Sequence, residues 1–283
     1  LATWSFRDHS RLRCSSTLFV NSSADVTLDN SVLCSAEKNT ADYPPHGNGN
    51  FASDRERMAA GVYRYNNVPT STFNLKVKNG ARLNLRGINC GSADMVNPIV
   101  FAFDGGTWIL DPVSWAGYDD KQETSHEFYV SAGKFGLFEA HTDGKGLTLE
   151  INEPEFRFSV PIIGAGDVIK TGAGTLAFGR EKRKYGASAF YTQNVPSWRT
   201  TGALVIREGG VALDDEWGYT NAVVDVKMVG GTFLDLGGRT FGGTVFGGGA
   251  LTNGVMTNAV FEIASAQTDG PAALVLEDGF TAE

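Results

Sequence analysis

The sequence predicts an all-β protein built as a parallel β-helix, and three observations support that prediction. Short runs in which apolar and polar residues alternate recur along most of the 283 residues. Gly-Gly or Asn-Gly signals separate these runs, and glycine accounts for 35 residues, about twice its usual share of ~7%. Similar short units also repeat between Val160 and Gly249. Such self-similarity is typical of a solenoid, in which each unit forms one turn of a stack.

Strands are predicted wherever apolar residues occupy alternate positions, because a strand with one buried and one wet face has a period of two. In chain order, the apolar positions of these strands are Phe73, Leu75 and Val77; Leu147, Leu149 and Ile151; Phe156, Phe158, Val160 and Ile162; Leu204 and Ile206; Val211 and Leu213; Val224, Val226 and Met228; and Phe261 and Ile263.

The spacing of the glycine pairs favours one kind of all-β fold. The second glycine of comparable units falls at positions 80 and 106, and again at 210, 231 and 249. The gaps of 26, 21 and 18 residues fit one turn of a three-sided parallel β-helix better than the eight-to-twelve-residue rhythm of hairpins. About ten turns stacked at ~4.8 Å would make a rod roughly 50 Å long.

Three segments interrupt the strand pattern and are expected to leave the stack. Residues 36–62 contain a polar stretch and a capping-box pattern, Ser53 with Glu56, which predicts one short helix. Residues 111–127 and 179–200 are the other two excursions. We expect residues 1–283 to form a single β-helix domain.

Composition excludes several classes of protein. An apolar content of 42% is too high for a disordered chain, and a formal net charge of -8 argues against nucleic-acid binding, which needs a broad basic surface. No apolar run is long enough to span a membrane. Cys14 and Cys34 are 20 residues apart, about one turn, so they could form a disulfide or remain two buried thiols. We expect no metal and no cofactor.

One segment matches a known repeat. GAGDVIKTGAGTLAFG, residues 164–179, resembles the autotransporter-associated β-strand repeat, whose units read G-x-G-x-L-x-K-x-G-x-G-T-L-x-L-x-G. The resemblance continues through TGALVIREGGVAL, LDLGGRTFGG and GALTNGVMTN and covers residues 160–260. The matching residues in the first segment are Gly164, Gly166, Lys170, Gly172, Gly174, Thr175, Leu176 and Gly179.

The resemblance implies a right-handed parallel β-helix in a large bacterial surface or secreted protein. Members of the family are mostly passenger regions used in adhesion and share no catalytic residues. The resemblance therefore predicts a noncatalytic extracellular scaffold or adhesin, and we expect this chain to continue into further repeats in a longer protein. The short loop that follows each family unit is expanded here into residues 180–201.

The expanded loop is the first candidate site. Basic groups beside exposed aromatic rings suit acidic or sulfated glycans, because cations pair with carboxylate or sulfate and rings stack on sugar faces. The loop could also be a solvated turn whose aromatic side chains fold back onto the stack. The candidate ligand-binding residues are Arg180, Lys182, Arg183, Lys184, Tyr185, Tyr191 and Trp198.

A second candidate combines aromatic and acidic residues. It could be a platform for a sugar, with or without a calcium ion held by carboxylates. Alternatively Trp108, which follows Gly105-Gly106, could simply pack in the core. The residues are Trp108, Asp111, Trp115, Tyr118, Asp119 and Asp120.

The alternative function is a β-helical polysaccharide lyase or glycoside hydrolase. Asp119-Asp120 is similar to the Asp-Asp pair of polygalacturonases, but the companion Asn-Thr-Asp, Gly-His-Gly and Arg-Ile-Lys segments are absent. A glycosidase needs two carboxylates at a separation that suits acid and base. Carboxylates in register on consecutive turns would therefore favour an enzyme, and we name no catalytic residue.

Overall fold

The computed structural model describes residues 2–14, 18–20, 24–35, 61–64, 72–84, 87–89, 97–110, 113–116, 122–125, 129–131, 138–158, 160–178, 198–213, 225–257, 259–262, 274–276 and 280–282. Every regular element in these residues is a β-strand. The short helix expected at Ser53 lies outside them, as does the rest of the 36–62 segment up to residue 60. Residues 61 and 62 belong to a strand.

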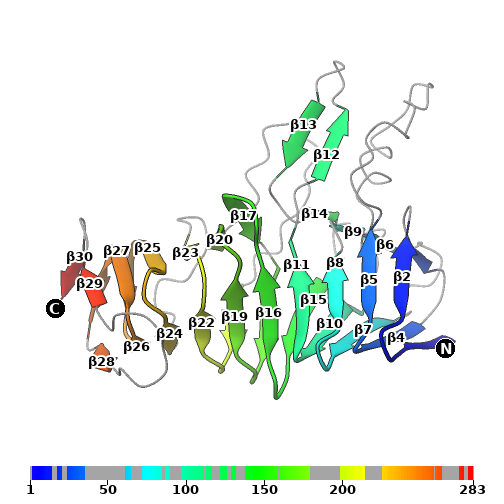
Figure 1. The fold of residues 1–283 in the computed structure, drawn as a ribbon, viewed down its shortest axis with the longest axis horizontal. Helices are drawn as coiled ribbons and strands as arrows, with labels where there is room; N and C mark the ends of the chain where they lie inside the picture. Colours follow the sequence, from blue (N-terminus) through cyan, green and yellow to red (C-terminus); the bar gives the residue numbers. More distant parts are fainter. Residues whose placement is uncertain are drawn as a thin grey trace.

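The strands form three faces, as expected for a parallel β-helix, and from β1 to β23 the chain visits them in the order face 1, face 2, face 3 (Figure 1). From β24 onward the described strands belong only to faces 2 and 3. Face 1 contains seven strands in parallel register: β1 (Ala2–Phe6), β4 (Ala24–Asp29), β7 (Phe73–Lys78), β10 (Ile99–Asp104), β15 (Phe138–Thr142), β18 (Ile162–Gly164) and β21 (Trp198–Thr200).

Face 2 is the longest sheet and runs along the long axis of the molecule in Figure 1. Its ten strands confirm the expected number of turns. They are β2 (Arg11–Cys14), β5 (Val32–Ser35), β8 (Arg82–Asn84), β11 (Gly106–Ile109), β16 (Leu147–Glu150), β19 (Val168–Thr171), β22 (Leu204–Ile206), β24 (Val226–Met228), β26 (Thr244–Gly247) and β28 (Val260–Glu262).

Face 3 is divided between two parallel sheets. The first serves the N-terminal turns and contains β3 (Leu18–Val20), β6 (Gly61–Arg64), β9 (Gly87–Asn89) and β14 (Tyr129–Ser131). The second serves the remaining turns and contains β17 (Glu155–Phe158), β20 (Thr175–Phe178), β23 (Gly210–Leu213), β25 (Phe233–Phe241), β27 (Gly249–Met256), β29 (Leu274–Leu276) and β30 (Phe280–Ala282).

A turn of the stack without an excursion is about as many residues long as the glycine spacing predicts. Leu147 pairs with Val168, 21 residues later, and Ala2 pairs with Ala24, 22 residues later. The number of residues between paired positions is larger where an excursion lies between two strands, so Ala24 pairs with Phe73, 49 residues later. The register also pairs Cys14 with Ser35 and Arg13 with Cys34, so the two cysteines lie on neighbouring strands but are not directly opposite each other.

Inward residues stack in ladders from turn to turn and form the core. Phe73, Leu75 and Val77 are buried as the alternation predicts, and Leu147, Leu149 and Ile151 likewise. At the centre, the ring of Trp108 stacks on that of Phe103, with centroids 5.6 Å apart. Its other ring neighbours are Phe101 on the same turn and Phe138 and Phe158 on the next turn. Aromatic contacts therefore connect the two turns.

Glycines at the corners allow one turn to rest directly on the backbone of the next. Gly172 has a φ of +82°, and a Cβ there would lie 2.2 Å from the carbonyl oxygen of Ile151 in the preceding turn. Gly231 has nearly the same φ, +81°, but a Cβ there would meet nothing within 4 Å. Both positions therefore require a positive φ, but only Gly172 must also lie close to the backbone of the preceding turn.

We therefore expect Gly172→Ala to destabilise the protein by at least about 2 kcal/mol more than Gly231→Ala, because both substitutions strain φ but only the first forces two turns apart. Chemical unfolding of the two variants and the parent measures the difference. Equal losses would mean that the corners do not require the close backbone approach.

Candidate functional site

The three segments that the sequence predicts to be excursions connect strands at two different corners. Residues 36–60 lie between β5 and β6, and residues 110–128 lie between β11 and β14, so both connect face 2 to face 3. Residues 179–197 lie between β20 and β21 and connect face 3 to face 1. The basic loop is therefore attached at a different corner from the other two segments.

Most of the basic loop falls outside the described residues. This applies to Arg180, Lys182, Arg183, Lys184, Tyr185 and Tyr191. Trp198 is described, and it forms the first residue of β21 rather than part of a loop. Its ring packs edge-on against Phe178 with centroids 5.6 Å apart, and the side chain is partly buried against the core.

The second candidate is also only partly described. Trp108 is fully buried among aromatic rings, which is the packing role considered above. Trp115 belongs to β12 (Val113–Ala116), which pairs with β13 (Gln122–Ser125) as an antiparallel hairpin and places Trp115 opposite Glu123. Figure 1 shows this hairpin standing away from the three faces. Asp111, Tyr118, Asp119 and Asp120 lie outside the described residues.

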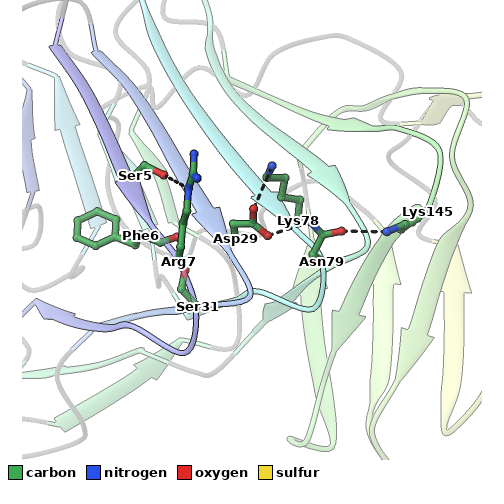
Figure 2. Close-up of polar contacts among 8 residues, drawn as sticks. All are labelled: Ser5, Phe6, Arg7, Asp29, Ser31, Lys78, Asn79 and Lys145. Carbon is green, nitrogen blue, oxygen red and sulfur yellow. Dashed lines mark hydrogen bonds and ion pairs between the residues drawn. The ribbon is translucent and has the colours of Figure 1, made fainter.

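A polar network runs along the corner between faces 1 and 2 (Figure 2). The Asp29 carboxylate accepts a 2.9 Å hydrogen bond from the Asn79 side chain and pairs with Lys78 at 3.1 Å. These two partners, Asn79 first, hold the pKa of Asp29 below its ordinary value. The ammonium of Lys145 then donates to the side-chain amide oxygen of Asn79 at 2.9 Å. The network crosses several turns and consists of contacts within the protein.

Carboxylates do occur on three consecutive turns at this corner, so the enzyme hypothesis needs a closer look. Asp104 accepts the backbone N–H of Lys145 at 2.9 Å, and Asp167 accepts that of Ala203 at 2.9 Å. Asp143 lies between them and is exposed. Two of the three carboxylates are therefore used to fasten one turn to the next. Within the described part of the chain, no group of three or more acidic, cysteine or histidine residues could hold a metal ion.

The corner between faces 2 and 3 contains a buried cation. Lys170 stands in the core ladder of face 2, between Leu149 and Ile206 of the adjacent turns, and its side chain is fully buried. Its ammonium donates to the backbone oxygens of Thr171 at 3.1 Å, Gly172 at 2.7 Å and Glu208 at 2.9 Å. Three N–H donors thus meet three carbonyl acceptors.

Glu208 completes this arrangement from the next turn. Its carboxylate accepts the backbone N–H of Gly172 at 2.7 Å and the hydroxyl of Thr171 at 3.1 Å. Burial lowers the pKa of Lys170 to about 8, and the charge of Glu208 opposes that shift. We call the set Lys170, Thr171, Gly172 and Glu208 the corner clamp. The corner clamp explains the lysine and the glycine at these positions of the repeat. The lysine donates to the carbonyl oxygens at the corner, and the glycine allows the backbone to approach the preceding turn.

Sequence reasoning identified the residue types of the corner clamp but missed its role. The same device recurs at Arg239, a buried arginine in β25 whose guanidinium donates to the carbonyl oxygens of Leu213 at 2.7 Å and Leu236 at 3.3 Å. A cation within a strand of a glycine-rich repeat, such as Lys170 in β19 or Arg239 in β25, is the signal that could have identified both.

Comparison with family models, curated proteins and solved structures finds no match for this chain. The structure accordingly supports the β-solenoid architecture that the repeat resemblance implied, without assigning the chain to a family. In the described residues, no helix is long and apolar enough to cross a membrane.

Replacing Lys170 by methionine tests the corner clamp. The substitution keeps the apolar stem but leaves three carbonyl oxygens without their donor, so we expect a loss of about 1–3 kcal/mol in the free energy of unfolding. Leu149→Met, one turn earlier in the same ladder, introduces the same side chain without removing a donor and should cost less than about 1.5 kcal/mol. Equal effects would show that the ammonium contributes nothing specific.

The stability of the parent should also depend on pH through Lys170. Its pKa in the folded protein, about 8, lies below the ordinary 10.5, so between these values the unfolded chain binds more protons and stability rises with pH. Relative to Lys170→Met, the parent should gain roughly 1 kcal/mol between about pH 7.5 and about pH 9.5, after allowance for solvent screening. Unfolding curves at both pH values measure this gain, and identical pH dependence in the two proteins would contradict it.

Proposed function

We propose that the protein is a noncatalytic β-helical scaffold of a bacterial cell surface or secretion product that acts as an adhesin and binds acidic glycans. The observation that supports this most strongly is the use of its carboxylates. Across the described residues, most acidic side chains hydrogen-bond to a neighbouring turn or to a nearby cation, as Asp29, Asp167 and Glu208 do. Groups engaged in this way are poorly placed to serve as a free acid and base.

The resemblance to the autotransporter-associated repeat supports the adhesin part of the proposal. The residues that make up the resemblance include Lys170 and Gly172 of the corner clamp, and Gly174, where a Cβ would lie 1.7 Å from the carbonyl oxygen of Glu153. The motif therefore has a physical function in stacking turns, which is what a long passenger region requires. An extracellular or surface location follows from the same proposal.

Continuation into further repeats is part of this proposal as well. Phe261 and Leu276 are exposed, yet they stand in register with the buried core residues Val245 and Leu251. Apolar side chains at inward positions are stabilised when another turn covers them, which supports a stack that extends beyond these strands.

The glycan is expected to meet the basic loop. Its residues, Arg180 to Lys184 with aromatic residues close by in the sequence, lie in the chain between β20 of face 3 and β21 of face 1. Loops carried by a rigid stack are the usual place for binding residues. Guanidinium and ammonium groups there would pair with carboxylate or sulfate groups of the glycan.

A glycan array with neutral, carboxylated and sulfated polysaccharides, followed by product analysis of every ligand, tests the function. We expect binding of intact acidic glycans, and a drop of roughly tenfold in affinity for Arg183→Gln/Lys184→Gln, since two charge-assisted contacts are lost. The control is Arg207→Gln/Lys227→Gln, which removes the same charge from two exposed positions at and near face 2. Cleavage into unsaturated or hydrolysed products would contradict the scaffold and favour the polysaccharide lyase or hydrolase.

A further inference from the structure

The outer side of face 1 contains a column of residues that follows the stack across seven turns. Parallel register places Ser5, Thr27, Lys76, Ala102, His141, Ile163 and Arg199 side by side on successive strands, from β1 to β21. The residues that flank them along each strand, such as Leu75 and Val77, are buried. The column therefore points to solvent.

Basic side chains in this column occupy every second turn. Lys76, His141 and Arg199 alternate with Ala102 and Ile163. Adjacent strands lie ~4.8 Å apart, so neighbouring basic groups are spaced by roughly 9.6 Å. Between them the column offers a methyl group and an aliphatic side chain, which leave room for a chain to lie along the face.

The two outer cations of the column have no partner within the described part of the chain. Neither Lys76 nor Arg199 forms an ion pair there, and both are exposed. Face 2 differs, because Arg82 pairs with Glu150 at 2.7 Å and Lys227 pairs with Asp167 at 3.4 Å. Lys78, on the same strand as Lys76, is also paired, with Asp29. Lys76 and Arg199 are thus available to a ligand.

Acidic groups flank the column on both sides. On the side of the corner to face 2, Asp29 pairs with Lys78, Asp104 accepts the backbone N–H of Lys145, and Asp143 is exposed. The adjacent outward column runs through Thr3, Asp25, Asn74, Val100 and Glu139. Asp25 accepts a 2.8 Å hydrogen bond from Asn74, and Glu139 contacts His141 at 2.9 Å. Glu139 thus orients the imidazole of His141, whereas Lys76 and Arg199 form no ion pair among the described residues.

We infer that this column, Lys76 to Arg199 on face 1, is a binding track for an extended anionic polysaccharide. Charged groups in an extended chain of disaccharide repeats recur at a spacing comparable to two turns of this stack. Lys76 and Arg199 stand four turns apart, roughly 19 Å. Carboxylate or sulfate groups two disaccharide repeats apart could therefore pair with them, while His141 and the aliphatic positions contact the sugars between them. The net charge of -8 disfavours loose polyanion binding, so a local match of this kind is required.

The track also leads to the basic loop. Arg199 follows Trp198 in β21, the strand that directly succeeds residues 179–197. A glycan lying along face 1 would therefore reach the corner where the loop is attached. The inference rests on the proposed function, because it names the class of glycan and the face over which the glycan runs.

The test measures the affinity of polygalacturonate and of heparin, with neutral dextran as the reference, for the folded protein and two track variants. Lys76→Gln/Arg199→Gln should bind the acidic probe roughly tenfold more weakly than the parent. Ala102→Glu, which places a carboxylate between two basic positions of the track, should weaken binding at least as much. The matched controls on face 2, Arg207→Gln/Lys227→Gln and Thr148→Glu, should leave affinity within about twofold of the parent.

Each outcome decides a different question. Losses in both track variants with unchanged controls support the track. Unchanged affinity in the track variants, together with a loss in Arg183→Gln/Lys184→Gln, overturns the track and leaves the proposed function standing. Equal losses in track and control variants show that binding follows net charge alone and also overturn it. If the parent binds neither acidic probe better than dextran, both the track and the proposed glycan-binding function are wrong.

Discussion

The structure depends on one constraint: each turn must lie on the backbone of the turn before it, only ~4.8 Å away. Along the faces, parallel hydrogen bonds meet this requirement. At the corners the chain bends, carbonyl groups lose their ladder partners, and side chains crowd the neighbouring turn. Glycine removes the crowding, as at Gly172. Buried cations supply the missing donors, as the ammonium of Lys170 does for three carbonyl oxygens.

The same constraint shapes what the surface can do. Because inward positions are filled by ladders such as Leu149, Lys170 and Ile206, binding groups must lie on outward columns or on excursions from corners. Outward columns repeat at the spacing of the stack, so they suit ligands that are themselves periodic. Carboxylates at the corners hydrogen-bond to the next turn, as Asp104 and Asp167 do, so they have a structural role. Lys76 and Arg199 on face 1, in contrast, form no ion pair within the described part of the chain.

Sequence alone predicted the fold class, because alternation and glycine spacing are direct results of strand geometry and turn length. The glycine spacing did not show that two different corners are involved. Gly80 and Gly106 lie at the corner that leads from face 1 into face 2, whereas the glycines at 210, 231 and 249 lie at the corner that leads from face 2 into face 3. The sequence did not give the register of the early turns, since Ala24 pairs with Phe73 across a long excursion. The column of Lys76, His141 and Arg199 was invisible for the same reason, as its members are separated by excursions of different length. Trp108 was left open because a tryptophan after two glycines fits either face of a strand.

The most direct test of this account is a disulfide formed across two turns, in a background with Cys14, Cys34 and Cys90 replaced by serine. Thr107 and Thr148 are paired on adjacent strands of face 2, so Thr107→Cys/Thr148→Cys should oxidise to an intramolecular bridge in the folded protein. Ile169 pairs with Thr148 one turn further on, which puts it roughly 9.6 Å from Thr107 and beyond the reach of a disulfide. Mass spectrometry of the digested protein should therefore find the first bridge and not that of Thr107→Cys/Ile169→Cys. The opposite result, or no bridge in either variant, would contradict the parallel stacking on which the whole description rests.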